Sequence, residues 1–89
     1  MRNPVRTSRF KKDVKLARRR GKNLSKLRTV MGKLITDESL ETRHKDHTLL
    51  GNYAGRRECH LEPDWLLIYK LDGKDIVFER TGTHADLFR

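Results

Sequence analysis

In the first 35 residues of the chain, hydrophobic side chains recur every three or four positions, which is the spacing of amphipathic helices. We expect Ser8 to cap the first helix, Gly21 to end it, and Asn23 or Ser25 to cap the second. Because the joint at residues 21–22 is short, an antiparallel helical hairpin is predicted. The apolar stripes of the two helices are then expected to pack on one face of a sheet.

The second half of the chain has the pattern of β-strands. Residues 53–61 alternate between two faces, residues 65–71 form a continuous apolar and aromatic run, and residues 75–80 form a third strand-like segment. The dipeptide Asp72-Gly73 between the last two segments is a signal for a two-residue type I′ hairpin. Three antiparallel strands in a meander are therefore expected.

Two further segments complete the predicted domain. Residues 3–7 can form a short edge strand, where Pro4 is tolerated. Residues 36–52 show no sustained period and are expected to form a long loop, of the kind that is usually functional or mobile. We find no repeat and no second domain. The fold class is predicted as α+β over residues 1–89, with two N-terminal helices packed on a small antiparallel sheet.

Composition and charge narrow the function classes. The chain has 89 residues, of which 35% are hydrophobic, so its core is small and a partner is expected to help stabilise it. Of the 21 Lys and Arg residues, 13 fall within residues 1–33, where Asp13 is the only acidic residue. This basic segment predicts a surface for RNA or for an acidic partner, the alternative being a solvated helical face. The single cysteine and the lack of an apolar leader or a long apolar run favour a cytoplasmic protein over a secreted or membrane-spanning one.

The turn between the first two strands carries candidate chemistry. Pro63 has to lie in this connection because it cannot donate to a sheet ladder, so the hairpin brings His60 and Asp64 close together. Arg80 ends the third strand and His84 follows it, and we expect both at the same edge of the sheet because neighbouring antiparallel strands begin and end there. The alternative is that Asp64 only stabilises the turn by accepting backbone hydrogen bonds, with His60 exposed.

These residues, completed by His47 from the loop, suit the cleavage of RNA. RNA carries its own nucleophile, the 2′-OH, so the protein has to supply a base, an acid for the 5′-oxygen, and positive charge for the phosphorane. Histidine can take either proton-transfer role near neutral pH, and Arg80 can clamp the phosphate. Phe88 or Trp65 can stack on an unpaired base. His44, on the same loop, is also a candidate, the alternative being that it is only a polar surface residue.

Three other interpretations remain open. One is a zinc site built from His47, His60, Asp64 and His84. The spacing of these residues contains no local ligand pair such as H-x₃-H, which argues against it. Trp65 and Phe88 can also be core residues, and the arginines near them can be solvated or paired with Glu58 and Glu79.

Residues 11–17, 45–47, 60–71 and 78–88 have the sequences KKDVKLA, KDH, HLEPDWLLIYKL and FERTGTHADLF. They resemble the RelE/ParE superfamily of bacterial type II toxins, and within it the YafQ-type mRNA interferases. The resemblance covers nearly the whole chain. It implies a RelE-like microbial RNase fold and a ribosome-dependent endoribonuclease that cuts mRNA without a metal or other cofactor. The implied products are a 2′,3′-cyclic phosphate and a 5′-OH.

The same resemblance implies roles for individual residues. The catalytic residues of YafQ-type toxins correspond to His47, His60, Asp64 and His84. The C-terminal aromatic residue of the family corresponds to Phe88, and its basic residue near the scissile phosphate corresponds to Arg80. Docking onto ribosomal RNA is expected from basic residues of the helices, namely Lys11, Lys12, Arg18, Arg19 and Arg20.

The partners that the resemblance implies are a cognate DinJ-type antitoxin that masks the site and the 70S ribosome with mRNA in its A site. Operator DNA is expected to be bound only by the toxin–antitoxin complex, and no membrane is involved. A preference for lysine-type AAA codons is also implied. Two rival functions remain. One is a non-enzymatic ParE-type inhibitor of DNA gyrase, which needs no histidines at a sheet edge, and the other is a basic regulator that binds naked DNA alone.

Overall fold

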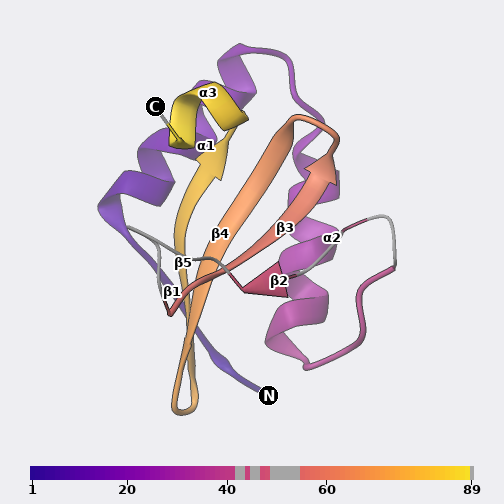
Figure 1. The fold of residues 1–89 in the computed structure, drawn as a ribbon, viewed down its shortest axis with the longest axis vertical. Helices are drawn as coiled ribbons and strands as arrows, with labels where there is room; N and C mark the ends of the chain where they lie inside the picture. Colours follow the sequence, from indigo (N-terminus) through magenta and orange to yellow (C-terminus); the bar gives the residue numbers. More distant parts are fainter. Residues whose placement is uncertain (42–43, 45–46, 49–54, 89) are drawn as a thin grey trace.

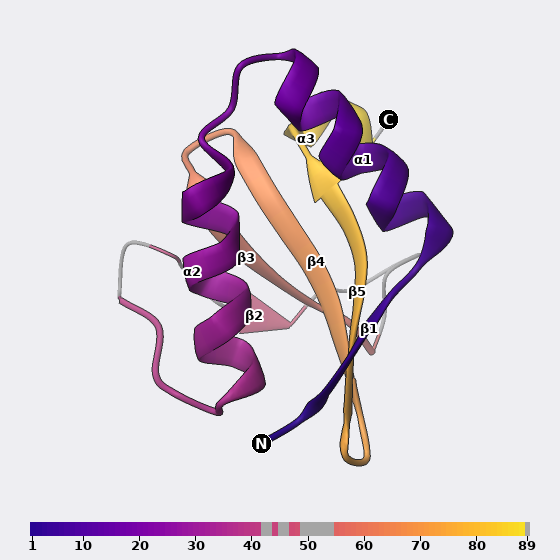
Figure 2. The ribbon, with the colours of Figure 1, turned by 180° about the vertical axis from the view of Figure 1, so that it is seen from behind.

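The structure, a computed structural model, describes residues 1–41, 44, 47–48 and 55–88. Five strands form one sheet in the order β1-β5-β4-β3-β2, with two long helices on one face and a short helix at the C-terminus (Figures 1 and 2). The strands are β1 (Asn3–Arg6), β2 (His47–Thr48), β3 (Arg57–Glu62), β4 (Trp65–Asp72) and β5 (Asp75–Gly82). The helices are α1 (Ser8–Arg19), α2 (Leu24–Ile35) and α3 (His84–Leu87).

The predicted α+β class is confirmed, and so is the antiparallel meander of β3, β4 and β5. The sheet is nevertheless mixed and not wholly antiparallel. The edge strand expected at residues 3–7 is present as β1, but it pairs in parallel with β5 from Asn3↔Asp75 to Arg6↔Phe78. Because β1 and β5 are far apart in sequence, the connection between them allows either a parallel or an antiparallel pairing. The hydrophobic pattern of the strands does not distinguish the two.

The helix ends follow side-chain capping, with one correction. Thr7 and not Ser8 is the N-cap of α1, because its backbone is extended and its Oγ1 accepts the N–H of Phe10 at 3.0 Å. Asn23 caps α2 as predicted by accepting the N–H of Ser25. Gly21 has a φ of +79°, the left-handed conformation that commonly ends a helix. From this connection, at the top of Figure 2, the two helices extend downward and diverge, so the predicted helical hairpin is splayed open.

Two strand boundaries also differ from expectation. β3 begins at Arg57 instead of residue 53, since the chain turns at Gly55 with a φ of +83°. Residues 53–54 lie outside the described part of the chain. Between β4 and β5 the two turn residues are Gly73 and Lys74, and only Gly73 has a positive φ, of +59°. Glycine at the first turn position is typical of a type II′ hairpin and not of the predicted type I′.

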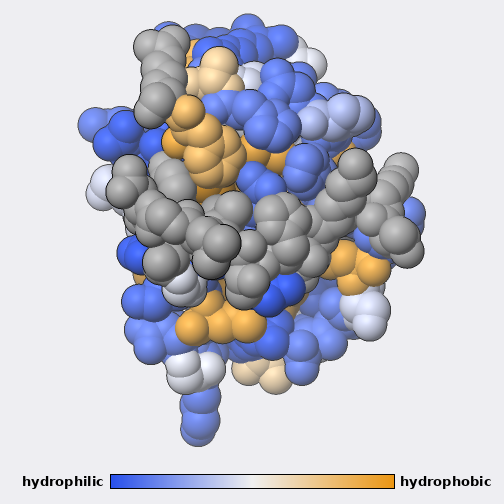
Figure 3. All heavy atoms as spheres, in the orientation of Figure 1, coloured by the Kyte–Doolittle hydropathy of each residue, from blue (hydrophilic) through white to orange (hydrophobic). Residues whose placement is uncertain are grey.

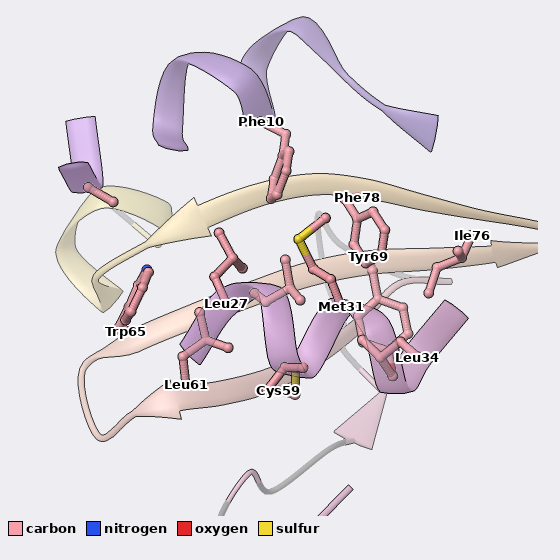
Figure 4. Close-up of a cluster of buried hydrophobic side chains, with 13 residues drawn as sticks. Phe10, Leu27, Met31, Leu34, Cys59, Leu61, Trp65, Tyr69, Ile76 and Phe78 are labelled. Carbon is pink, nitrogen blue, oxygen red and sulfur yellow. The ribbon is translucent and has the colours of Figure 1, made fainter. Parts of the chain in front are cut away.

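The core fills the space between the sheet and the two long helices. Alternate residues of β4, such as Leu67 and Tyr69, belong to this core and are fully buried. Figure 4 shows Tyr69 among core side chains of the two helices, such as Leu34. Trp65 belongs to this core as well, with 1% of its surface exposed. On the other face of the sheet a smaller cluster forms from Leu66, Ile68 and Leu87, so that α3 packs where the long helices do not. Within the described residues, no helix has the length and apolar character needed to cross a membrane.

Candidate active site

His84 and Asp64 form the first of two histidine–carboxylate pairs. Asp64 lies in the tight turn after β3, and its Oδ1 accepts two hydrogen bonds from His84, from the backbone N–H at 2.9 Å and from ring Nδ1 at 2.6 Å. These two bonds, the backbone one first, hold the pKa of the Asp64 carboxyl below its ordinary value, so it is ionised at neutral pH. Because Nδ1–H is the donor, the other ring nitrogen, Nε2, is left for chemistry.

His60 and Glu58 form the second pair. They are two residues apart on β3, so they share the sheet face opposite to Cys59 and Leu61, which face the long helices. Nε2 of His60 lies 3.4 Å from Oε2 of Glu58, whose side chain is almost fully buried. A buried carboxylate at that distance fixes the orientation of the imidazole.

The two histidine rings face each other, with centroids 5.7 Å apart and planes inclined by 58°. Phe88 continues the row, with its ring centroid 6.3 Å from that of His84 and 42% of its surface exposed. The predicted hairpin therefore does bring His60, Asp64 and His84 together. Figure 3 shows this face of the molecule, on which hydrophilic and apolar side chains meet over α3.

Helix α3, which carries His84, is held in place by Asp86. Its carboxylate accepts the N–H of Thr83, while its own N–H donates to the Thr83 hydroxyl, which makes a capping box. Arg20 at the end of α1 donates two hydrogen bonds to the same carboxylate, at 2.6 and 3.3 Å. The guanidinium, more than Thr83, keeps the pKa of Asp86 far below its ordinary range. Leu87 completes the attachment by packing on β4.

Arg80 is placed at the predicted end of β5, and the contact resolved for its guanidinium is to Asp13 on α1. Nε donates to Oδ2 at 2.7 Å and an Nη donates to Oδ1 at 3.3 Å, while the backbone N–H of Thr81 also donates to this carboxylate. The pair is largely buried. Arg80 is therefore held rigidly at the strand end, two positions before Gly82 and close in sequence to His84.

Two loop histidines have different positions. The backbone of His47 lies in β2, opposite Glu58 of β3, which places it beside the strand that carries His60; its side chain lies outside the described part. His44 is not the surface residue of the alternative interpretation, since it is buried and its Nδ1 donates to the backbone carbonyl of His60 at 2.7 Å. It thus contacts β3 at the residue whose ring belongs to the site.

The predicted RNA-binding cations fall into two groups. Lys11, Lys12, Arg18 and Arg19 are exposed on α1, as a docking surface requires. Arg20 is different, since it forms the ion pair with Asp86 and so has a structural task. The sequence left open that an arginine near the site pairs with Glu58 or Glu79. Arg56 does so, because its Nε lies 2.6 Å from Oε2 of Glu79. The described residues contain no cluster of three or more His, Cys, Asp or Glu side chains placed to hold a metal ion.

Glu58 and Asp13 are the residues of the site that the sequence reasoning did not select. Glu58 had a signal, because strand alternation places it on the same face as His60. Asp13 also had one, since it is the only acidic residue in a strongly basic segment. Neither signal identifies the side chain with which Glu58 or Asp13 pairs, because that depends on how the side chains pack in the folded protein.

Comparison with known proteins gives consistent matches. Residues 2–89 match the family model described as "Bacterial toxin of type II toxin-antitoxin system, YafQ". The chain is 52% identical over 80 residues to the mRNA interferase toxin YafQ of Escherichia coli K12, a match that covers 89% of this chain and 87% of that protein.

Solved structures agree. The crystal structure of YafQ from E. coli strain BL21(DE3) matches with a TM-score of 0.95 and 47% sequence identity over 100% of both chains. The crystal structure of the E. coli DinJ-YafQ toxin-antitoxin complex matches with a TM-score of 0.92 and 48% identity, over 99% of this chain and 98% of that one.

Proposed function

This chain belongs to the YafQ family of toxins from bacterial type II toxin–antitoxin systems, and we propose that it is an mRNA interferase that cleaves mRNA in the A site of the ribosome and so stops translation. The single observation that carries the proposal is the pair of histidine rings 5.7 Å apart, each held by its own carboxylate. That arrangement supplies two proton-transfer groups on one open surface.

The reaction needs no outside nucleophile. One histidine removes the proton of the ribose 2′-OH, and the 2′-oxygen attacks the neighbouring phosphorus. The bond from phosphorus to the 5′-oxygen breaks, and the second histidine gives that oxygen its proton. The products are a 2′,3′-cyclic phosphate and a 5′-OH, and the two histidines end with their protonation states exchanged.

The remaining site residues support this transfer. Asp64 and Glu58 orient the rings of His84 and His60, so that each ring presents one nitrogen at a fixed place. Arg80, held by Asp13, stabilises the charge that develops on the phosphorane. Phe88 stacks on a base, since its ring is exposed beside His84. His47 completes proton transfer from the neighbouring strand β2.

The test is primer extension on a reporter mRNA translated in vitro, with wild-type protein and with His84→Ala, in the presence and absence of ribosomes. We expect cuts within codons that need both ribosomes and His84. The same lanes reveal whether AAA codons are preferred. Absence of cuts, with gyrase inhibited instead, would favour a non-enzymatic ParE-type toxin and overturn the proposal.

A modified substrate assigns the two proton-transfer roles. In an RNA whose scissile 5′-oxygen is replaced by sulfur, the leaving thiolate departs without a proton, so a missing general acid no longer slows the reaction. We expect one of His60→Ala and His84→Ala to regain most of its activity on this RNA, while the other stays slow. If neither regains activity, the two rings do not act as an acid–base pair.

The proposed partners follow from the family. A DinJ-type antitoxin binds and neutralises the toxin, as DinJ is found with YafQ in the solved complex. The ribosome is held by the exposed cations of α1, Lys11, Lys12, Arg18 and Arg19. Operator DNA is bound by the toxin–antitoxin complex and not by the toxin alone. Mobility-shift assays with the operator, the toxin and the complex test this last point.

A further inference from the structure

The helix connection, residues 20–22 between α1 and α2, lies at the same end of the sheet as α3 and the turn between β3 and β4 (Figure 1). Its backbone is fixed by the hydrogen bonds that end α1. The N–H of Gly21 donates to the carbonyl of Arg18 and that of Lys22 donates to the carbonyl of Ala17, both at 3.0 Å. With Gly21 at a φ of +79°, this is a Schellman motif. The side chains before and after Gly21 therefore leave the connection from defined places.

Before Gly21, Arg20 holds helix α3. Its Nη1 and Nη2 donate to the two carboxylate oxygens of Asp86 at 2.6 and 3.3 Å, and a two-pronged contact of this kind fixes orientation as well as distance. The carboxylate lies close over Gly82, since a Cβ at Gly82 would come within 2.9 Å of Oδ2 of Asp86. Arg20 therefore fixes the orientation of the short helix that carries His84.

After Gly21, Lys22 holds the turn that carries Asp64. Its Nζ lies 3.1 Å from Oε1 of Glu62 and 5.8 Å from the centroid of the Trp65 ring. Glu62 and Trp65 are the pair that closes the hairpin, so Lys22 contacts both ends of the turn. Lys26 of α2 donates to the other carboxylate oxygen of Glu62 at 2.9 Å. The ammonium groups, that of Lys26 first, keep the pKa of Glu62 below its ordinary value, so the carboxylate is ionised at neutral pH.

The hydrogen bond that these contacts surround is itself exposed. Asp64 and His84 each have more than half of their side-chain surface open to solvent. Water competes for such a pair, and ion pairs at a surface are weak. The 2.6 Å contact between Nδ1 of His84 and Oδ1 of Asp64 therefore depends on how α3 and the turn are placed relative to each other. The carboxylates of Asp86 and Glu62, which the helix connection holds, are by contrast mostly buried.

We propose that the helix connection is a positioning device for the pair of His84 and Asp64, in which Arg20 sets the place of α3 and Lys22 sets the place of the β3–β4 turn. The two cations are only two residues apart on one fixed piece of backbone, so they determine the distance between the helix and the turn. The inference rests on the proposed endonuclease function. A displacement on the order of 1 Å at a proton-transfer group can lower a rate about 10²-fold.

The first test measures kcat and KM of ribosome-dependent mRNA cleavage for Arg20→Gln and Lys22→Met, which each remove one charge. We expect kcat to fall about tenfold in each variant with KM within about twofold, while Lys22→Arg, which keeps the charge, stays within about threefold of the wild type. Lys74→Met is the matched control, because it removes an exposed charge at the far hairpin between β4 and β5, and it is expected to change neither constant. A rise in KM alone would make Arg20 and Lys22 ribosome contacts and overturn the proposal.

A double-variant cycle shows whether Arg20 acts through the pair. Asp64→Asn weakens the hydrogen bond with His84 directly, and Arg20→Gln is expected to weaken the same bond by releasing α3. We therefore expect the loss of kcat in the double variant to be at least about threefold smaller than the product of the two separate losses. Separate losses that multiply would show that Arg20 acts elsewhere in the fold and would overturn the proposal.

A measurement that needs no cleavage separates this inference from the proposed function. Nitrogen NMR of histidine-labelled protein at alkaline pH distinguishes rings protonated at Nδ1 from rings protonated at Nε2, and the signals of His84 are those lost in His84→Ala. We expect the Nδ1–H form in the wild type and in Lys74→Met, and a mixture of both forms when Arg20→Gln and Lys22→Met are combined. The circular dichroism of the combined variant is expected to match that of the wild type.

The outcomes of the NMR experiment are distinct. An unchanged Nδ1–H form in the combined variant would overturn the positioning role, whatever happens to kcat. A mixture of forms in a protein that cuts no mRNA would support the positioning of His84 and count against the endonuclease function instead.

Discussion

The two faces of the sheet are built from the same strands and are used differently. On the helix face, alternate residues of β3, β4 and β5 meet α1 and α2 in an apolar core. On the other face, the residues between them form only the small cluster of Leu66, Ile68 and Leu87, beside two histidines and two carboxylates. One face of the sheet stabilises the domain, and the other positions chemical groups.

The comparison shows how an 89-residue chain combines stability with an exposed site. Burial on the helix face is the main source of stabilisation, since apolar burial is the dominant favourable term in folding. The site face relies instead on hydrogen bonds and ion pairs at defined distances, such as Asp64 with His84 and Arg20 with Asp86. Such contacts contribute little to stability at a surface but define geometry well.

The largest expected effect falls on the site face alone. His84→Ala removes a proton-transfer group and is expected to lower kcat for ribosome-bound mRNA by ~10²–10⁴-fold. The ring is half exposed, at 52% of its side-chain surface, so the midpoint of thermal unfolding is expected to change little. Single-turnover cleavage and differential scanning fluorimetry measure the two quantities. A large fall in the unfolding midpoint would contradict the assignment.

Two neighbouring leucines on β4 lie on opposite faces of the sheet and so allow the two faces to be tested separately. Leu67 and Leu66 are both fully buried, but the first faces the long helices and the second faces α3. Replacing either by Ala is expected to cost ~2–5 kcal/mol of unfolding free energy in urea titrations. Only Leu66→Ala is expected to lower kcat as well, because Leu87 of α3 packs against it. Equal kcat values for the two variants would sink the idea that α3 is positioned from this face.

Glu58→Gln is expected to have a smaller effect. The amide keeps the shape of the side chain but removes the charge 3.4 Å from Nε2 of His60. Because the proton-transfer group itself remains and only its orientation is loosened, we expect kcat to fall by less than ~10²-fold. Glu79→Gln is the matched control, since that carboxylate pairs with Arg56 instead of a histidine. Equal kcat values for wild type and Glu58→Gln would exclude a role for the Glu58 charge.

The smallest expected effect is that of Asp86→Asn on stability. The folded-state pKa of Asp86 is lowered by Arg20 and Thr83, so ionised Asp86 stabilises the folded state above its ordinary pKa of 3.8. This contribution is lost as the pH falls below 3.8 toward the lowered pKa. The unfolding midpoint of Asp86→Asn should therefore lie below that of the wild type at pH 7, and the difference should shrink in acid. A difference that is constant from pH 7 to pH 2 would count against the ion pair.

Much of the site could be predicted because its signals are local. Pro63 forces a turn between His60 and Asp64, and the antiparallel meander brings His84 to the same end of the sheet. The helices and three of the strands likewise follow from periodicity. The N-cap of α1 was misplaced by one residue because Thr7 and Ser8 are both good caps, and only the backbone conformation of Thr7 decides between them.

The set of elements, the apolar stripes and the hairpin that joins a histidine to a carboxylate could therefore all be predicted from local sequence signals. Three features could not be predicted in this way: β1 runs parallel to β5, Arg80 pairs with Asp13 across 67 positions, and Arg20 pairs with Asp86 across 66. The difference lies in the separation along the chain of the residues that interact. Periodicity, caps and turns depend on neighbouring residues, whereas these pairs depend on how packing of the helix face places α1 against β5 and α3.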